Sequence, residues 1–258
     1  MSIYQDEMYE HVRDDEKLWR YMDFSRFVSL LETHSLFFSR ADRFGDTWEG
    51  AISPIDVDAW EAFVGGSKES AADRTTLIAN YRRTFAALRR HTYISCWHQN
   101  SGESEAMWKL YLKSTEGIAL QTSFGCLKSQ LERSRRLIRL GKVQYRDYRI
   151  DPVPGGKPHA IGESYLTGPY APFISKRRGF AHENEVRAVF QDSYRNLNDP
   201  SESDFGIAVC VEIGELIENI YMAPQTPAWL HSAVQTVLDK FDVRLRVAAS
   251  EFDEPPPC

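Results

Sequence analysis

The sequence predicts an α+β fold in which helices flank mixed, mostly antiparallel sheets. A regular parallel sheet needs a crossover helix between successive strands, but the sequence has more strand-like segments than helices to connect them in this way. The chain has 258 residues, of which 42% are hydrophobic and 26% charged, so it is large enough to bury a substantial core. We expect an N-terminal segment over residues 1–17 and one catalytic-type domain over 18–250. A helical insertion at about 55–90 and a disordered tail over 251–258 complete this expected organisation.

The first half of the chain alternates short strands with helices. Residues 18–21 and 35–39 have strand character, and between them Asp23 is placed to cap a helix over 24–32. The aromatic and aliphatic spacing within 55–90 predicts two helices. The remaining expected elements are a strand over 92–97, a helix over 103–112 that Gly117 ends, and a strand over 118–122.

The second half contains more strands than helices. Proline and glycine over 151–158 predict a surface loop placed to act as a mobile lid. Strands are expected at 143–145, 185–190, 207–213, 220–222 and 243–248, and a helix at 227–241.

Composition limits the classes of function. The net charge of −6 argues against a generally basic nucleic-acid-binding protein. Positive residues dominate between Lys128 and Arg149, which indicates a solvated helix face or, alternatively, a nearby anionic ligand. The four cysteines have no zinc-type spacing and are expected to be reduced thiols. With neither a signal-peptide core nor an apolar run of membrane-spanning length, the sequence predicts a cytoplasmic protein without a membrane partner.

The run from His182 to Phe190 carries the strongest chemical pattern. Glu183 and Glu185 stand two residues apart at the start of an apolar strand, where alternate side chains share a face. Like charges at that distance repel, so the pair indicates a candidate active site. The alternative is an edge whose glutamates form salt bridges with Lys176, Arg177, Arg178 or Arg187.

The order of three blocks adds a resemblance. Arg20 in a strand, Ser95 near a strand end and the Glu183-x-Glu185 pair resemble the Arg…Ser…Glu-x-Glu pattern of ADP-ribosyltransferases. That resemblance implies the corresponding fold, with NAD as substrate and transfer to a macromolecular acceptor or NAD hydrolysis. Glu185 would stabilise the ribosyl cation and Glu183 would orient or deprotonate the acceptor.

The other implied ligand contacts are less specific. Arg20 would hold the pyrophosphate, and Ser95 would lie near the ribose or support Glu185. Trp97 and Tyr111, with Trp108 as a further candidate, would stack on nicotinamide or adenine. The remaining cofactor-binding candidates are Arg40 and Lys176. Alternatively, Arg20 pairs with Asp23 or covers aromatic surface, and the aromatic residues pack in the core.

Several longer stretches resemble a bacterial family catalogued as domain of unknown function 2971. They comprise residues 18–21, 36–50 and 107–111, Gly117, Lys176 and residues 183–187. Gly45 and Thr47-Trp48 depart from the pattern where Asn and Pro-aromatic are expected. Because no activity is assigned to that family, this resemblance implies only the extent of a domain and no particular reaction.

Two other function classes stay open. Asp46 and Glu49 follow the strand at 35–39, and their expected role is to cap the next helix. With Glu183 and Glu185 they could instead surround a divalent cation in a nuclease or phosphodiesterase. The third class is a non-catalytic binding or regulatory module. A toxin or defence role follows only from the transferase reaction class, and the oligomeric state is open.

Overall fold

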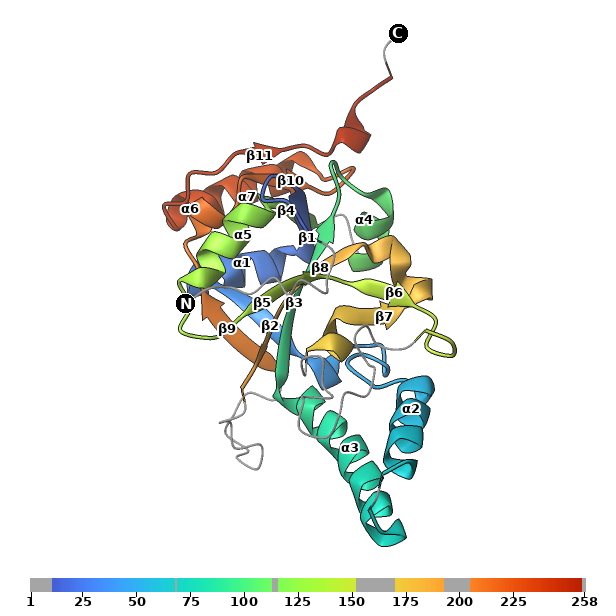
Figure 1. Ribbon diagram of the computed structural model, residues 1–258. Coiled ribbons are helices and arrows are strands. Elements are labelled where there is room, and N and C mark those ends of the chain that lie inside the picture. Colours follow the sequence, from blue (N-terminus) through green and yellow to red (C-terminus); the bar gives the residue numbers. More distant parts are fainter. Residues whose placement is uncertain (1–10, 68, 113–115, 152–169, 193–204, 257–258) are drawn as a thin grey trace.

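The computed structural model describes residues 11–67, 69–112, 116–151, 170–192 and 205–256 (Figure 1). Its fold is α+β, built around a mixed, mostly antiparallel sheet with flanking helices, as predicted. No helix in these ranges is long and apolar enough to cross a bilayer. The lid predicted over 151–158 lies outside them except for Asp151.

The main sheet has nine strands in the described part of the chain. Its path is β11-β10-β4-β1-β3-β2-β9, with β8 on the other edge of β3 and β5 on β8. All pairs are antiparallel except β10 with β11. The strands are β1 (Lys17–Asp23), β2 (Ser35–Arg40), β3 (Thr92–Gln99), β4 (Gly117–Ser123), β5 (Arg139–Lys142), β8 (Glu185–Gln191), β9 (Gly206–Cys210), β10 (Asn219–Met222) and β11 (Val247–Ala248).

A second, parallel sheet pairs β6 (Gln144–Arg146) with β7 (Ser175–Arg177). The helices are α1 (Phe24–Thr33), α2 (Pro54–Gly65), α3 (Ala71–His91), α4 (Glu105–Tyr111), α5 (Phe124–Glu132), α6 (Ile213–Leu216) and α7 (Ala228–Lys240). The described residues also form the short 3₁₀ helices η1 (Ala41–Arg43), η2 (Ala171–Ile174), η3 (Arg178–Glu183) and η4 (Glu251–Asp253). Figure 1 shows α2 and α3 projecting together from one end of the molecule.

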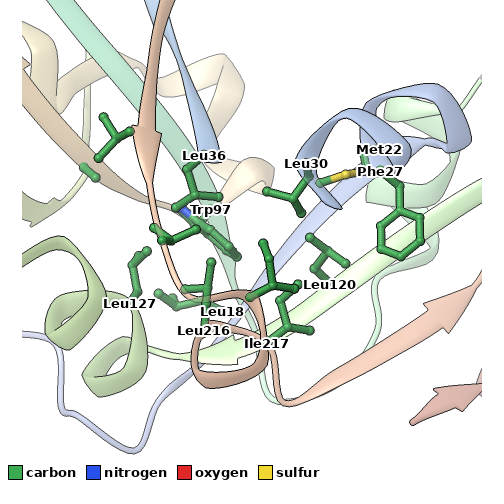
Figure 2. Packing of buried hydrophobic residues seen from close by; sticks show 14 of the residues in the cluster. Leu18, Met22, Phe27, Leu30, Leu36, Trp97, Leu120, Leu127, Leu216 and Ile217 are labelled. Atoms are coloured by element: carbon green, nitrogen blue, oxygen red, sulfur yellow. The ribbon is translucent and has the colours of Figure 1, made fainter. Parts of the chain in front are cut away.

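The main core lies where helices cover the sheet. Phe27 and Leu30 of α1 contribute to the same buried cluster as Leu127 of α5, Leu216 of α6 and Leu238 of α7. Figure 2 shows the α1, α5 and α6 side chains gathered around strand residues of the same cluster. Asp23 caps α1 as expected, because its carboxylate accepts a hydrogen bond from the Arg26 amide. Burial of this apolar stripe therefore fixes α1 beside β1 and β2.

Several predicted elements differ from the structure. Gly117 begins β4 instead of ending α4, whose C-cap is Leu112, and a Cβ on Gly117 would lie 2.1 Å from the Leu112 side chain. The expected strand over 207–213 ends at Cys210, because Ile213 starts α6, and that over 243–248 is reduced to Val247–Ala248. Strand β5 and most of α5 were not predicted. Of the solvated helix face expected between Lys128 and Arg149, only residues 128–132 are helical, as the end of α5, and β5 lies at 139–142.

The tail is ordered further than predicted. Residues 251–253 form η4, and the Glu251 amide donates to the Glu103 carboxylate at 2.7 Å. Ser250 donates to the same carboxylate at 2.8 Å, and so does the Trp108 indole. A buried acid thus fastens the segment after β11 to α4, and this contact was not apparent from the acidic, proline-rich composition.

Candidate functional site

A split in the main sheet creates the candidate site. Strand β8 pairs with β3 along Thr92–His98. On the opposite edge of β3, the described registers pair β1 only with His98 and Gln99, and β2 only with Tyr93 and Ile94. The middle of β3 therefore faces a gap between two diverging strands. A cleft of about 850 Å³ opens there, a size common for small-molecule sites.

The cleft collects most of the predicted site residues. Its lining includes Arg20, Trp97, Tyr111, Lys176, Glu183 and Glu185, together with Asp46 and Glu49. Ser95 lies directly behind Arg20, whose Nη1 donates to the Ser95 hydroxyl at 2.9 Å. Arg40 is separate from this group, because it is buried and paired with Asp42 at 2.6 Å. The sequence blocks at 20, 95 and 183–185 are thus neighbours in space.

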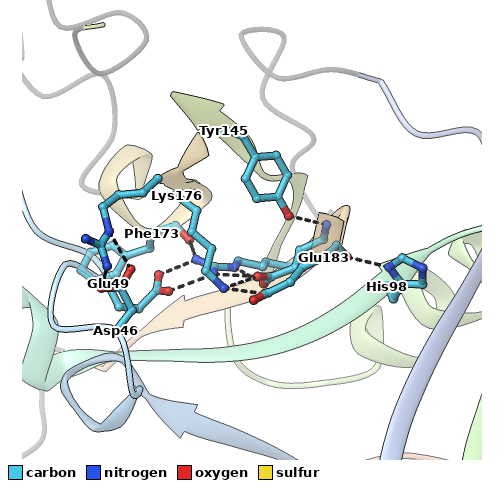
Figure 3. Close-up of polar contacts among 10 residues, drawn as sticks. Asp46, Glu49, His98, Tyr145, Phe173, Lys176 and Glu183 are labelled. Atoms are coloured by element: carbon cyan, nitrogen blue, oxygen red, sulfur yellow. Dashed lines mark hydrogen bonds and ion pairs between the residues drawn. The ribbon is translucent and has the colours of Figure 1, made fainter. Parts of the chain in front are cut away.

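Lys176 joins the two glutamates of the pair (Figure 3). Its Nζ lies 2.5 Å from Glu183 Oε2 and 2.7 Å from Glu185 Oε1. The prediction that the two glutamates share one face of a strand is wrong. Glu183 ends η3 and β8 begins only at Glu185. Between them, Asn184 adopts a left-handed conformation with φ of 37°. A turn, and not the pleat of a strand, brings the carboxylates together.

Arg187 forms a buried salt bridge with Glu185. The Arg187 side chain is fully buried, and its Nε donates to Glu185 Oε2 at 2.7 Å. Its two Nη atoms bind both oxygens of Glu49 at 2.5 and 3.0 Å, and Nη1 also donates to the Phe173 carbonyl at 2.7 Å. The salt-bridge alternative is therefore correct for Lys176 and Arg187, whereas Arg177 and Arg178 pair with Asp46 and Asp151.

The two glutamates have opposite proton affinities. Burial, reinforced by a hydrogen bond and charge repulsion from Glu185, raises the pKa of Glu183 to about 7. Burial alone would raise the pKa of Glu185 too, but Arg187, the hydrogen bond from Glu183 and Lys176 hold it well below its usual range. Near neutral pH, Glu185 is therefore a fixed anion while Glu183 exchanges a proton.

Arg20 supplies a further cation to the lining of the cleft. Its guanidinium bridges three strands, since it donates to Ser95 of β3 and to the Phe37 carbonyl of β2 at 3.1 Å. It also lies over the Trp97 ring, 5.6 Å from the centroid. The predicted alternative pairing with Asp23 is wrong, because Asp23 caps α1, whereas the covering of aromatic surface is correct. Among the described residues no carboxylate pairs with Arg20.

The candidate stacking residues differ in exposure. Trp97 and Trp108 are 1% and 3% exposed, so both pack in the interior, as the core alternative predicted. Tyr111 is 44% exposed and lines the cleft. Desolvation raises the pKa of its hydroxyl, and the charges of Glu183 and Glu185 act in the same direction. Tyr111 is thus the aromatic residue best placed to contact a ligand.

Asp46 and Glu49 do not form the alternative metal set. Asp46 forms a salt bridge with Arg177 at 2.7 Å, and Glu49 forms one with Arg187. Within the described ranges no group of three or more His, Cys, Asp and Glu side chains could hold a metal ion. The expected capping role is also wrong: Ser53 and Asp56 cap the next helix, whereas Asp46 accepts from the Trp48 amide in a turn.

Two further polar residues, Tyr145 and His98, support the site. The Tyr145 hydroxyl accepts a hydrogen bond from the Glu185 amide at 2.8 Å, and His98 Nδ1 lies 2.6 Å from the Glu183 carbonyl (Figure 3). Burial lowers the pKa of His98, so the neutral ring donates from Nδ1. Both contacts fix the backbone around Asn184. Tyr145 was expected only as part of a strand, so its role in the site was not predicted.

Comparisons with known proteins give little further definition. No family model matches the chain, so the resemblance to domain of unknown function 2971 gains no support, and no curated protein matches it. Among solved structures the chain is similar to Thermus sp. 2.9 DarT in complex with NAD+. The identity is 10% and the TM-score 0.40, over 95% of this chain and 100% of that chain.

Proposed function

We propose that the cleft binds NAD and transfers ADP-ribose to a macromolecular acceptor, or to water. The observation that carries this proposal is the polarity of the cleft. Its lining combines Arg20, which has no carboxylate partner among the described residues, with a carboxylate pair of unequal proton affinity. A substrate with an anionic part and a centre that becomes cationic matches both groups.

The anionic requirement follows from the cost of burying a charge. Burial is the main cause that lowers the pKa of Arg20, and its two hydrogen-bond acceptors are neutral oxygens. An anion that binds within hydrogen-bond distance of such a guanidinium stabilises its buried charge, and the planar arrangement of its donors suits phosphate oxygens. The pyrophosphate of NAD is a suitable anion.

The carboxylate pair supports the cationic step. Breaking the bond between nicotinamide and ribose builds positive charge on the ribose, which carboxylates stabilise in the related chemistry of glycosidases. Glu185, anionic throughout the neutral range, would supply this stabilisation. Glu183, with a pKa of about 7, would accept the proton of the attacking hydroxyl, amide or water.

Nicotinamide release tests the proposal. The purified protein is incubated with NAD alone and with protein, DNA or RNA as acceptor, and nicotinamide is quantified by chromatography. We expect release by the wild type and a loss of at least about a hundredfold in Glu185→Gln, the scale of removing one group that stabilises transition-state charge. Glu132→Gln, an exposed residue on α5, is the matched control.

The opposite results are equally clear. Equal rates in wild type and Glu185→Gln, with both variants folded by circular dichroism, would contradict the role of Glu185. No release with any acceptor would contradict the transferase and leave the non-catalytic binding module.

A further inference from the structure

One face of α1 forms a wall of the cleft with unassigned polar groups. Arg26, Ser29 and Thr33 follow one another at about one helical turn and all line the cleft. They run beside the buried apolar stripe of α1, so packing of that stripe sets their direction. The wall and Arg20 line the same cleft, and the positive charge of Arg26 helps to lower the pKa of Arg20, after the larger effect of burial.

The wall presents a second cation with little neutralisation. The Arg26 side chain is 75% exposed, and its Nε lies 3.6 Å from Asp23 Oδ2, a carboxylate that already caps α1. The Ser29 hydroxyl makes no hydrogen bond within the described residues, so it can donate to a ligand. Thr33 uses its hydroxyl hydrogen on the Ser29 carbonyl at 2.7 Å. Two guanidinium groups and one hydroxyl donor therefore face the same space.

An exposed aromatic ring stands beside these donors. Phe37 of β2 lines the cleft and is 45% exposed, whereas its large apolar neighbours Leu36 and Phe38 are fully buried. Its carbonyl is the one that receives Arg20 Nη2 at 3.1 Å. A ring that is accessible and adjacent to a phosphate-binding group is suited to stack on a planar base.

We infer that this wall binds the nucleoside-diphosphate part of the ligand. Arg20 and Arg26 contact the two phosphates, Ser29 donates to one of them, and Phe37 stacks on the base. The inference rests on the proposed function for the choice of NAD as the complete ligand. It deepens that proposal by assigning the substrate class, a diphosphate ester of a nucleoside, to residues outside the glutamate pair.

Calorimetric titration of the full chain with ADP tests the inference without any turnover. We expect Arg26→Gln to weaken ADP binding about tenfold, as for the loss of one charge-assisted contact. Phe37→Ala should weaken ADP binding by a similar factor but leave the affinity for inorganic pyrophosphate unchanged. Arg83→Gln, an exposed arginine on α3, is the control and should bind like the wild type.

Two results would overturn the inference: wild-type protein that binds no ADP, or Arg26→Gln and Phe37→Ala that both bind ADP with wild-type affinity. Its failure is distinguishable from that of the transferase. Nicotinamide release together with unchanged ADP affinity in both variants would overturn only this assignment. ADP binding that depends on Arg26 without nicotinamide release would overturn only the transfer reaction.

Discussion

Glu183 makes the stability of the protein depend on pH. Its pKa of about 7 in the folded state exceeds its ordinary value of 4.5, so the folded protein retains this proton while the unfolded chain loses it. The stabilisation is fully present below pH 4.5 and is lost as the pH rises through 7. We expect this residue to cost roughly 1–3 kcal/mol of unfolding free energy between pH 5 and 8.

Urea denaturation at several pH values checks this expectation. Glu183→Gln carries no titrating proton, so its unfolding free energy should fall less between pH 5 and 8 than that of the wild type. Parallel curves for the two proteins would show that Glu183 ionises normally. The depressed pKa of Glu185 acts in a separate, acidic range, where stability is lost as the pH falls.

The pairing of Arg187 with Glu49 should be among the most sensitive contacts in the molecule. Both side chains are fully buried, so removal of the negative charge leaves Arg187 with Glu185 as its remaining carboxylate partner and without access to water. We expect Glu49→Gln to lower the free energy of unfolding by about 3 kcal/mol. Glu61→Gln, which breaks the exposed pair with Arg82, should cost less than about 1 kcal/mol in the same denaturation series.

Single residues were predictable where their chemistry is local. Glu183 and Glu185 attract attention by charge and spacing alone, and Arg20 and Ser95 by their order in the chain. Arg187 appeared only as one of several possible salt-bridge partners, and its bond to Glu49 joins positions 138 residues apart. Nothing in either local sequence records that contact, because long-range ion pairs are set by topology.

At the scale of elements, the N-terminal caps of α2 and α3 differ in burial and in their contacts with the rest of the molecule. Ser53 and Asp56 form a buried capping box, and Asp56 also pairs with Arg146 of β6 at 3.3 Å. Ser70 caps α3 at an exposed position. We expect Ser53→Ala to cost about 2 kcal/mol and Ser70→Ala about 1 kcal/mol or less, measured by chemical denaturation. Equal costs would mean that burial of the first cap adds nothing.

Elements with a strong periodic pattern were predicted well, and short ones were not. The apolar stripe of α1 and the alternation of β3 specify both elements from sequence, and their observed bounds agree with the expected ones within two residues. Strand β5 has the sequence RLGK, which has no strand pattern, and becomes a strand because β8 offers it an edge. The context of the sheet decides such segments.

At the scale of the whole molecule, the class of fold followed from counting strands and helices, but the split between β1 and β2 did not. That split depends on which ends of β3 each neighbour meets, and these registers are long-range choices. The cleft therefore could not be placed from sequence, although its residues could be named. The same limitation hid the order of the tail.

Truncation of the tail should affect the whole molecule. Removal of residues 250–258 deprives the buried Glu103 of its Ser250 and Glu251 partners and leaves only the Trp108 indole as donor. We expect that truncation to lower the midpoint of thermal unfolding by several degrees, whereas removal of 254–258 should leave it unchanged. Equal midpoints for both truncated chains would show that the tail contributes nothing.

The small parallel sheet is too short to define its own alignment, since β6 and β7 pair over only three residues each. Contacts of its side chains with other elements define the alignment instead. The Tyr145 hydroxyl accepts a hydrogen bond from the Glu185 amide, Arg146 pairs with Asp56, and Lys176 binds both glutamates. A slip of β7 by one position would replace Lys176 with Ser175 or Arg177 and leave the acids without their ammonium ion. The charges in the cleft thus also define the alignment of the small sheet, because the observed register is the one that places Lys176 between the two acids.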